Sequence, residues 1–361
     1  MPTIRVSLGE RSYPVHIGAG LIDRAGEYIR DALGASCAVA VVTDDNVAPL
    51  YLARVMASLE AAGLRACSIS LPHGEQAKCL ARLSDLYTFL CARHITRSDV
   101  IVALGGGVIG DLTGLAAATY LRGVRFVQIP TTLLAQVDSS VGGKVAVDLP
   151  QGKNLVGAFW QPKLVICDPD TLNTLTEDYW HDGLGEVVKY GCINDEPLFS
   201  LLERCAPGGR EALMASMDEI LRHCIQAKAV VVEQDEQDTG LRMTLNFGHT
   251  IAHAVETCQH YTGFRHGEAV SLGMAVITRL SEDRGLTSPG TAQRLTALLR
   301  ALGLPDELPD IPEAQLVSAM TMDKKSQGAA LRIILLEKIG ACVIHPTTAA
   351  FFEGMSAVSP G

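Results

Sequence analysis

In the first half of the chain, short apolar runs alternate with longer amphipathic stretches. Short apolar runs that end in polar turn residues predict strands, and the longer amphipathic stretches between them predict helices. The runs that predict strands lie within residues 37–46, 66–72, 99–107, 125–140 and 163–169, and those that predict helices within 47–62 and 77–94. Because strands separated by helices form parallel sheets, we expect an N-terminal α/β domain with a parallel sheet.

From about residue 175 the pattern becomes predominantly helical. Long stretches with helical periodicity cover residues 211–235 and 266–285, and residues 331–346 have the pattern of a late hairpin. We therefore predict two domains, an N-terminal parallel-sheet domain at 1–173 and a mainly α-helical C-terminal domain at 174–361.

Composition narrows the class of protein. The chain has 361 residues, 48% of them hydrophobic, and a formal net charge of −10. That charge argues against nucleic-acid binding. No apolar run reaches the roughly 20 residues of a membrane span, and the N-terminus lacks the apolar segment of a signal peptide. The ten cysteines are scattered, which is typical of reduced thiols in a cytoplasmic protein.

A glycine turn follows the strand predicted at 99–107. In "LGGGVIGD", Gly105, Gly107 and Gly110 match the G-x-G-x-x-G pattern, which lets a backbone approach a pyrophosphate at a helix N-terminus. The acidic residue expected about 20 positions later is absent from "VRFVQIP" at 124–130. An ordinary tight turn therefore remains an alternative.

Two further loops follow predicted strands, where open α/β sheets bind ligands. "TDDN" at 43–46 offers carboxylates for ribose hydroxyls, or simply a helix N-cap. "PHGEQAK" at 72–78 places Glu75 three residues before Lys78. That pair is either a surface ion pair or part of a cofactor site.

The stretch from Val137 to Asn154 reads as a glycine-rich loop with two lysines. Lys144 and Lys153 lie there with Asp138 and Asn154. Lysines flanked by glycines in an acidic protein are candidate anion ligands, although a solvated lysine is the simpler interpretation. Lys324 and Lys325 in "MDKKSQG" offer the same choice.

The second half carries a candidate metal site. "GLGEVVKYG" sets Glu186 and Lys189 three residues apart among apolar neighbours, where buried charges need partners. In "RMTLNFGHTIAHAVE", the polar positions fall at helical intervals along one face; they are Arg242, Asn246, His249, His253 and Glu256. With His266, the residues Glu186 and His249 make a Glu/His/His set that leaves one position open, as catalytic zinc sites do. The alternative is a set of satisfied core histidines. Thr250 after His249 excludes the H-E-x-x-H motif of metalloproteases.

Taken together, these motifs resemble those of the 3-dehydroquinate synthase family, within the sugar-phosphate cyclases. The resemblance runs from about residue 42 to residue 340 and includes "GEQAK", "GGGVIGDLTG", "TYLRGVRFVQIPTTLLAQVDSSVGGK", "GKNLVGAFWQP", "GEVVKYG", "LNFGHTIAHAVE", "HGEAV" and "DKK". It implies that residues 1–173 form a dinucleotide-binding domain for NAD and that residues 174–361 form the metal- and substrate-binding domain. It also implies that Glu186, His249 and His266 bind zinc or cobalt.

The resemblance also implies a cofactor set and a substrate set. Residues expected to contact NAD are Asp44, Asn46, His73, Gly74, Glu75, Gln76, Lys78, Gly106, Gly107, Asp111, Thr131, Thr132, Lys144, Lys153, Thr171, Leu172 and Thr174. Residues expected to surround the substrate are Asp138, Lys144, Asn154, Lys189, Lys228, Arg242, Asn246, His253, and one or both of Lys324 and Lys325. Arg122 is expected to contact the substrate's phosphate, across the interface of a homodimer. Arg265, before His266, departs from the aliphatic residue that the family would lead us to expect.

The activity that the resemblance implies is a step of the shikimate pathway of aromatic amino-acid biosynthesis. The sugar phosphate 3-deoxy-D-arabino-heptulosonate 7-phosphate would become 3-dehydroquinate and phosphate by transient oxidation with NAD, phosphate elimination, re-reduction and intramolecular aldol closure. Three alternatives remain at this point. They are another sugar-phosphate cyclase, a metal-dependent polyol dehydrogenase of related fold, and a catalytically silent NAD-sensing protein.

Overall fold

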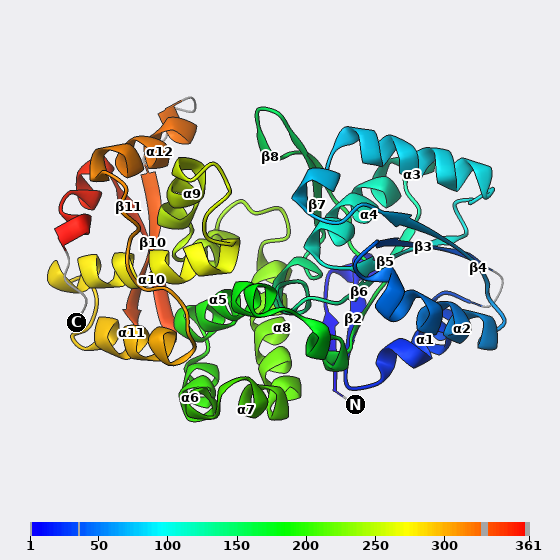
Figure 1. Ribbon diagram of the computed structural model, residues 1–361, viewed down its shortest axis with the longest axis horizontal. Coiled ribbons are helices and arrows are strands. Elements are labelled where there is room, and N and C mark those ends of the chain that lie inside the picture. Colours follow the sequence, from blue (N-terminus) through cyan, green and yellow to red (C-terminus); the bar gives the residue numbers. More distant parts are fainter. Residues whose placement is uncertain (1, 35–36, 326–330, 358–361) are drawn as a thin grey trace. The chain divides into compact units, whose positions relative to one another are not determined.

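The computed structural model describes residues 2–34, 37–325 and 331–357 (Figure 1). The chain forms two compact units. Unit 1 comprises Met1–Leu175 and Lys228–Gln237, and unit 2 comprises Thr176–Ala227 and Asp238–Gly361. The predicted division after residue 173 did not anticipate that residues 228–237 return to unit 1. Helical periodicity marks the helix α8 (Met217–Gln234), but it does not show against which core each end of the helix packs.

Unit 1 contains a seven-stranded sheet in the order β1-β2-β9-β6-β5-β3-β4. All neighbouring strands are parallel except β1 and β2. The strands are β1 (Thr3–Val6), β2 (Tyr13–Ile17), β3 (Ala38–Asp44), β4 (Arg65–Leu71), β5 (Val100–Gly105), β6 (Arg125–Pro130) and β9 (Leu164–Cys167). The helices are α1 (Ala25–Leu33), α2 (Ala53–Ala61), α3 (Leu80–Ala92) and α4 (Gly107–Thr119). The predicted α/β class is confirmed.

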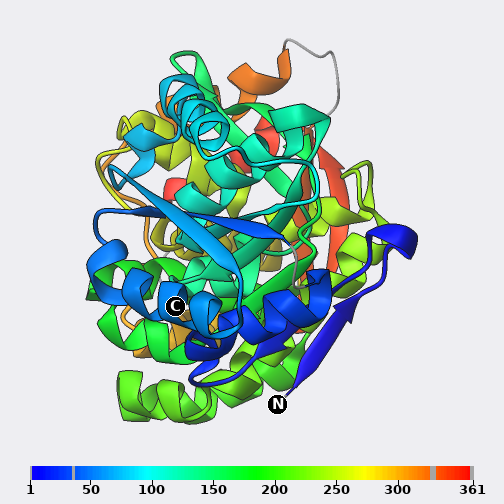
Figure 2. The ribbon, with the colours of Figure 1, turned by 90° about the vertical axis from the view of Figure 1, so that its right-hand side faces the viewer.

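Helices cover both faces of this sheet (Figure 2). Successive side chains of a strand point to opposite faces. On β3, Val39 and Val41 belong to a core with α1 and α2, whereas Ala40 and Val42 belong to a core with α3 and α4. Burial on both faces explains why the central strands are continuous apolar runs rather than alternating ones.

The connections leave β3 and β5 in opposite directions across the sheet. β3 leads through α2 to β4 on one side, and β5 leads through α4 to β6 on the other. Open α/β sheets bind ligands at such a reversal, beyond the carboxyl ends of the two strands. Asp44 ends β3 and Gly105 ends β5, so the predicted cofactor loops begin where this fold places a ligand.

Two sequence-based expectations in unit 1 need correction. The strand predicted over 125–140 ends at Pro130, and Ala135–Ser139 forms a helical turn. The loop predicted over 137–154 is largely a hairpin of β7 (Lys144–Leu149) and β8 (Gly152–Phe159). The alternating side chains of Val145 and Val147 are buried in the core beside α3 and α4, and that burial favours a strand over a loop.

Unit 2 is mainly helical, as predicted. Its helices are α5 (Glu177–Ile193), α6 (Glu196–Cys205), α7 (Gly209–Ala215), the first part of α8, α9 (His249–Cys258), α10 (His266–Asp283), α11 (Thr291–Ala301) and α12 (Glu313–Lys325). The predicted late hairpin is confirmed as β10 (Leu331–Lys338) and β11 (Ala341–Thr347). α10 is buried almost along its whole length, so it is the central helix of the unit. Among the described helices, none combines the length and apolar composition that a membrane crossing requires.

Candidate active site

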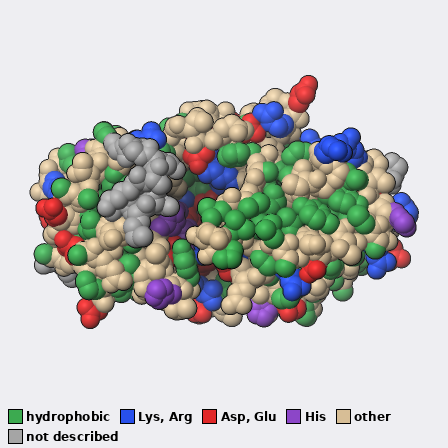
Figure 3. Space-filling view, turned by 90° about the horizontal axis from the view of Figure 1, so that it is seen from above, with side chains coloured by type: hydrophobic (Ala, Val, Ile, Leu, Met, Phe, Trp, Pro, Cys, Tyr) green, Lys and Arg blue, Asp and Glu red, His purple; other side chains and the backbone are tan. Residues whose placement is uncertain are grey.

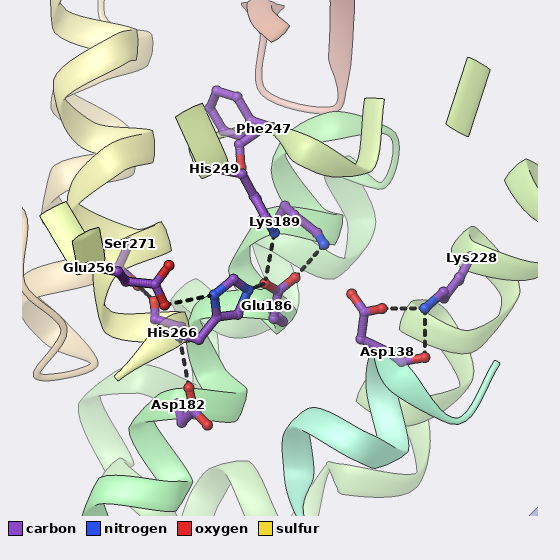
Figure 4. A network of polar contacts seen from close by, with 11 residues as sticks. Asp138, Asp182, Glu186, Lys189, Lys228, Phe247, His249, Glu256, His266 and Ser271 are labelled. Carbon is purple, nitrogen blue, oxygen red and sulfur yellow. Dashed lines mark hydrogen bonds and ion pairs between the residues drawn. The ribbon is translucent and has the colours of Figure 1, made fainter. Parts of the chain in front are cut away.

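Three segments of unit 2 bring the predicted metal ligands together. Glu186 comes from the middle of α5, His249 is the first residue of α9 and His266 the first of α10. The Oε1 atom of Glu186 lies 3.5 Å from Nε2 of His249 and 3.4 Å from Nε2 of His266 (Figure 4). Candidate ligand atoms of all three lie within 4.8 Å of one another. The structure therefore joins a carboxylate and two imidazoles that are up to 80 residues apart in the sequence.

Each imidazole has an acceptor beside its other ring nitrogen. Nδ1 of His249 lies 3.1 Å from the carbonyl oxygen of Phe247, and Nδ1 of His266 lies 3.3 Å from Oε1 of Glu256. In the tautomer that donates from Nδ1, both rings turn Nε2 toward Glu186. Such outer hydrogen bonds commonly fix the orientation of metal-binding histidines.

The charges around Glu186 are balanced inside the protein. Burial lowers the pKa of His249 to about 3, so this ring is neutral, as a metal ligand must be. Burial also disfavours charge on His266, but hydrogen bonds to Glu186 and Glu256 outweigh it and raise the pKa of His266 to about 10, so this ring must release a proton when it binds a metal ion. Lys189 forms an ion pair with Oε2 of Glu186, and both side chains are only 1% exposed. One carboxylate oxygen thus faces the imidazoles while the other faces an ammonium group.

This donor set suits a divalent transition metal. One carboxylate and two imidazoles are hard-to-borderline ligands that zinc and cobalt accept. Three protein ligands leave at least one coordination position for a substrate oxygen, as in catalytic sites. The alternative of satisfied core histidines is less consistent with two imidazoles directed at one buried carboxylate.

The polar face predicted from Arg242 to Glu256 is not one continuous helix. Arg242 and Asn246 belong to a short 3-10 helix, Leu241–Asn246, and α9 starts only at His249. Gly248 lies between them with a φ of +80°, a left-handed conformation that ends one helix before the next begins. The spacing of three and four residues therefore predicted a shared helical face correctly only for His249, His253 and Glu256, which all lie on α9.

His253, one turn after His249, is exposed and lies beside the candidate metal ligands. Its ring centroid is 5.6 Å from that of His249 and 6.0 Å from that of His266. Glu256 is buried. Sequence reasoning placed Glu256 on the polar face without a role, and the structure gives it one as the hydrogen-bond partner of His266.

Asp182 is a site residue that sequence reasoning missed. It lies on α5, one turn before Glu186, and its Oδ1 accepts a hydrogen bond of 2.8 Å from the N–H of Gly267. Burial raises the pKa of Asp182. An acidic residue one turn before Glu186 on the same apolar helix was the available signal.

In unit 1, the glycine turn leaves backbone exposed at the start of α4. β5 ends at Gly105 and α4 starts at Gly107. A Cβ atom on Gly106 would lie 3.0 Å from Cγ2 of Thr132, and one on Gly107 would lie 3.2 Å from Oγ of Ser139. A side chain at either position would require Thr132 or Ser139 to shift by a few tenths of an ångström. The N–H groups of a helix N-terminus attract a pyrophosphate.

Asp44 closes β3 and caps the segment that follows. Its Oδ1 accepts hydrogen bonds of 2.9 Å from the N–H groups of Asn46 and Val47, so the capping interpretation holds for that oxygen. Burial raises the pKa of Asp44. The exposed Asp45 accepts hydrogen bonds from the backbone and ring of His73, which joins the loop after β3 to the loop after β4.

Lys78 connects three predicted site residues. Its ammonium forms an ion pair of 2.6 Å with Asp111 and donates to Oδ1 of Asn154 at 2.5 Å. Burial alone would lower the pKa of Lys78, but the carboxylates of Asp111 and Glu75 raise it. Lys153 lies 3.7 Å from Glu75. Predicted residues from three separate motifs therefore share one polar cluster.

The remaining cofactor residues differ in their surroundings. Gly74 and Gln76 lie in the loop after β4, and Thr131 is buried after β6. Thr171, Leu172 and Thr174 belong to the 3-10 helix Pro169–Thr174. The hydroxyl of Thr171 already contacts the carbonyl of Asp168 and the side-chain amide of Gln136, so it serves the packing of unit 1.

The predicted substrate residues are divided between the units. Arg122, Asp138, Lys144, Asn154 and Lys228 belong to unit 1, and Lys189, Arg242, Asn246 and His253 to unit 2. Lys228 donates to the carbonyl of Asp138 at 2.7 Å and pairs with its carboxylate (Figure 4). Lys144 and Arg122 are exposed. Lys324 and Lys325 end α12, and their side chains lie outside the described part of the structure.

Comparisons with known proteins agree with this arrangement. Residues 68–182 match the model of the 3-dehydroquinate synthase N-terminal family, and residues 183–326 match that of the 3-dehydroquinate synthase C-terminal family. The chain is 47% identical to a 3-dehydroquinate synthase of Clostridium perfringens, over 98% of this chain and 100% of the relative. It is 48% identical to a 3-dehydroquinate synthase of Citrifermentans bemidjiense, over 94% and 93% of the two chains.

A solved structure agrees as well. A 2-epi-5-epi-valiolone synthase from Streptomyces hygroscopicus subsp. jinggangensis, solved with NAD+ and Zn2+ bound, is 28% identical. The TM-score is 0.86, with 97% of each chain covered. From the family match over both units and the relatives at nearly full length, the chain belongs to the 3-dehydroquinate synthase family.

Proposed function

We propose that this chain is an NAD- and metal-dependent carbon–oxygen lyase that converts 3-deoxy-D-arabino-heptulosonate 7-phosphate into 3-dehydroquinate and phosphate. The observation that carries the proposal is the convergence of Glu186, His249 and His266 in a member of this family. When bound, the metal supplies a Lewis acid for a substrate hydroxyl and NAD supplies a reversible hydride acceptor.

The residues of unit 2 would hold the metal and position the substrate. Glu186, His249 and His266 are the proposed ligands, and the bound Zn2+ of the valiolone synthase supports a transition metal here. The exposed His253 beside the ligands is a proposed polar contact for a substrate hydroxyl. The buried guanidinium of Arg242 is a proposed contact for a substrate anion, because Arg binds phosphates and carboxylates through paired hydrogen bonds.

The residues of unit 1 would hold NAD and further anionic groups. The turn at Gly106 and Gly107 is the proposed pyrophosphate contact, at the position where the fold places ligands. Lys144 and Lys228 supply positive charge in a chain whose net charge is −10. In such a chain, lysines at the proposed site favour an anionic substrate over a neutral polyol.

The decisive experiment compares phosphate release with the state of the nicotinamide. An oxidation that only prepares an elimination must be reversed before the product leaves. Phosphate should therefore accumulate far beyond the NAD supplied, without a matching rise in the absorbance of reduced nicotinamide. Reduced cofactor equal to the substrate consumed would identify a polyol dehydrogenase instead. A panel of other phosphorylated sugars, none of which should release phosphate at a comparable rate, distinguishes the related cyclases.

We also propose that the chain forms a homodimer. The supporting observation is a group of exposed apolar side chains on β8 in unit 1, where Leu155, Val156 and Phe159 are 57%, 36% and 40% exposed. Figure 3 shows hydrophobic side chains gathered on this part of the surface. Exposed apolar patches of this kind commonly become buried between protein chains. Sedimentation velocity should give twice the chain mass of 38.4 kDa, and a single-chain mass would contradict the proposal.

The cytoplasm is the proposed location of the enzyme. All ten cysteines are free thiols in the structure, which is typical of a reducing compartment. Cell fractionation tests this directly, and recovery with secreted protein would contradict it.

A further inference from the structure

Each of the three proposed metal ligands, Glu186, His249 and His266, has a glycine as a chain neighbour. Gly185 precedes Glu186, Gly248 precedes His249 and Gly267 follows His266. None of these glycines has room for a side chain. A Cβ atom on Gly185 would lie 2.0 Å from the carbonyl oxygen of Gly267, and one on Gly267 would lie 1.8 Å from the carbonyl oxygen of Asp182.

Gly248, the third of these glycines, also packs closely against α10, at a point further along that helix. A Cβ atom on Gly248 would lie 2.6 Å from Cγ of Met274 and 2.7 Å from the carbonyl oxygen of Val270. From the other side, a Cβ atom on Gly273 would lie 2.2 Å from the carbonyl oxygen of Gly248. The backbones of α5 and of the start of α9 thus both touch the backbone of α10, each one residue away from a ligand.

The overlaps at these glycines are large enough to displace a neighbouring helix. Real Cβ atoms are essentially never closer than 3.0 Å to such neighbours, so a methyl group at Gly185 would separate α5 from α10 by about 1 Å. Functional constellations tolerate displacements of only about 0.5 Å. Since backbone carbonyls cannot rotate away as flexible side chains do, the displacement would reach the adjoining ligand.

We propose that Gly185, Gly248 and Gly267 are positioning residues for the metal site. They hold the three ligand-bearing segments in backbone contact through α10, and this contact sets the separations among the carboxylate and the two imidazoles. Asp182 reinforces one of these contacts, because its carboxylate binds the N–H of Gly267. The inference rests on the proposed metal-dependent function.

The test measures zinc affinity, by competition with a chromophoric chelator, and the visible absorption spectrum of the cobalt-loaded protein. Gly185→Ala should bind zinc at least 10-fold more weakly than the parent, and its cobalt spectrum should change because the ligand geometry changes. Gly248→Ala should also bind zinc more weakly than the parent, both because of its overlaps with α10 and because a side chain is strained at a φ of +80°. Both should be compared under conditions in which circular dichroism shows a folded chain.

Two controls separate positioning from general destabilisation. Gly191→Ala makes the same chemical change on α5, where the nearest atoms, those of Phe199, lie 3.1 Å away and no ligand adjoins. Leu299→Ala removes buried apolar atoms of α11 and lowers the stability of unit 2 away from the ligands. Both should keep zinc affinity within about 3-fold of the parent.

The outcomes are distinct. A folded Gly185→Ala or Gly248→Ala that binds zinc like the parent overturns the proposal, as does an equal loss of affinity in Leu299→Ala. If Gly185→Ala does not fold, Gly248→Ala alone decides. A parent protein that binds no divalent metal contradicts the proposed function itself, and this result is recognisable before any variant is made.

Discussion

His249 and His253 lie one turn apart on α9, yet their surroundings differ. The side chain of His249 is 12% exposed and faces the carboxylate of Glu186, whereas His253 is exposed. At the scale of single residues, the partner atoms of an imidazole decide between a metal ligand and a substrate contact. This difference can be tested with a matched pair of variants.

We expect His249→Ala to lose bound metal and nearly all activity, while the fold survives. Removing one of three protein ligands leaves too few donors to retain a divalent ion against solvent. His253→Ala is the control and should keep its metal while losing activity. Metal content near one ion per chain in purified His249→Ala would show that the ligand assignment is wrong.

Glu256 offers a second prediction at this scale. Its carboxylate lies beside Nδ1 of His266, so Glu256→Leu should weaken zinc binding by about 10- to 100-fold, which is typical of outer hydrogen-bond partners. Glu256→Gln keeps an acceptor oxygen and should bind zinc more tightly than Glu256→Leu. Equal affinities in both variants would argue against an orienting role.

Lys144 belongs to both predicted sets, but we expect it, like Arg242, to matter more for the substrate than for NAD. Because charge-assisted hydrogen bonds orient an anionic substrate, Lys144→Ala and Arg242→Ala should each lower kcat/KM for the sugar phosphate by about 100-fold. The affinity for NAD, measured by isothermal titration calorimetry, should change much less. Lys163→Ala, at an exposed lysine outside the predicted sets, serves as the control. A comparable loss of NAD affinity would place either residue at the cofactor site.

At the scale of elements, the structure shows how one side chain joins two distant segments. Glu313, the first residue of α12, accepts hydrogen bonds from the backbone N–H groups of Gly354 and Ser356 at 2.9 and 3.0 Å. These bonds hold the 3-10 helix Met355–Ala357 against the start of α12. They also lower the pKa of Glu313 below its ordinary value of 4.5.

This contact should weaken in acid. A lowered pKa means that the stabilisation is present above pH 4.5 and is lost as the pH falls through the folded-state pKa. Amide hydrogen exchange at Gly354 and Ser356, corrected for the intrinsic rate, should therefore show less protection at lower pH. In Glu313→Gln the acid-dependent loss at these two amides should disappear. An unchanged pH dependence in that variant would assign the effect to another group.

At the scale of the whole molecule, the candidate cofactor and metal residues belong to different compact units. The predicted NAD contacts all lie in unit 1, and the three metal ligands all lie in unit 2. A ligand that binds only the folded state stabilises it by about 2.7 kcal/mol at 100 times its Kd. Each ligand should therefore protect its own unit first.

We expect hydrogen exchange to separate the two effects. NAD alone should increase the protection of the carboxyl ends of β3 and β5 and of the first turn of α4. Zinc alone should protect the middle of α5 and the starts of α9 and α10. The reference for both measurements is the protein in zinc-free buffer that contains a chelator and no NAD. Zinc-dependent protection confined to unit 1 would contradict the assignment of the metal to unit 2.

Features that depend on local pattern could be predicted from the amino-acid sequence. Apolar runs and helical periods identified the central strands and the helices α2, α3, α8 and α10, because the buried face of each element repeats at a fixed interval. The glycine turn was recognisable because Gly106 and Gly107 follow a strand and open a helix. Glu186, His249 and His266 stood out as polar groups in apolar surroundings, and the resemblance to a family gave them a shared role.

Features that depend on contacts between distant segments became visible only in the folded chain. The final turns of α8 pack with unit 1, the stretch after Gly143 pairs as a hairpin, and Gly248 divides the predicted helical face. Asp182 and Glu256 gained roles through hydrogen bonds to residues 85 and 10 positions away. A local pattern specifies which face a residue occupies, but its partners across that face come from packing, which the periodicity of one segment does not contain.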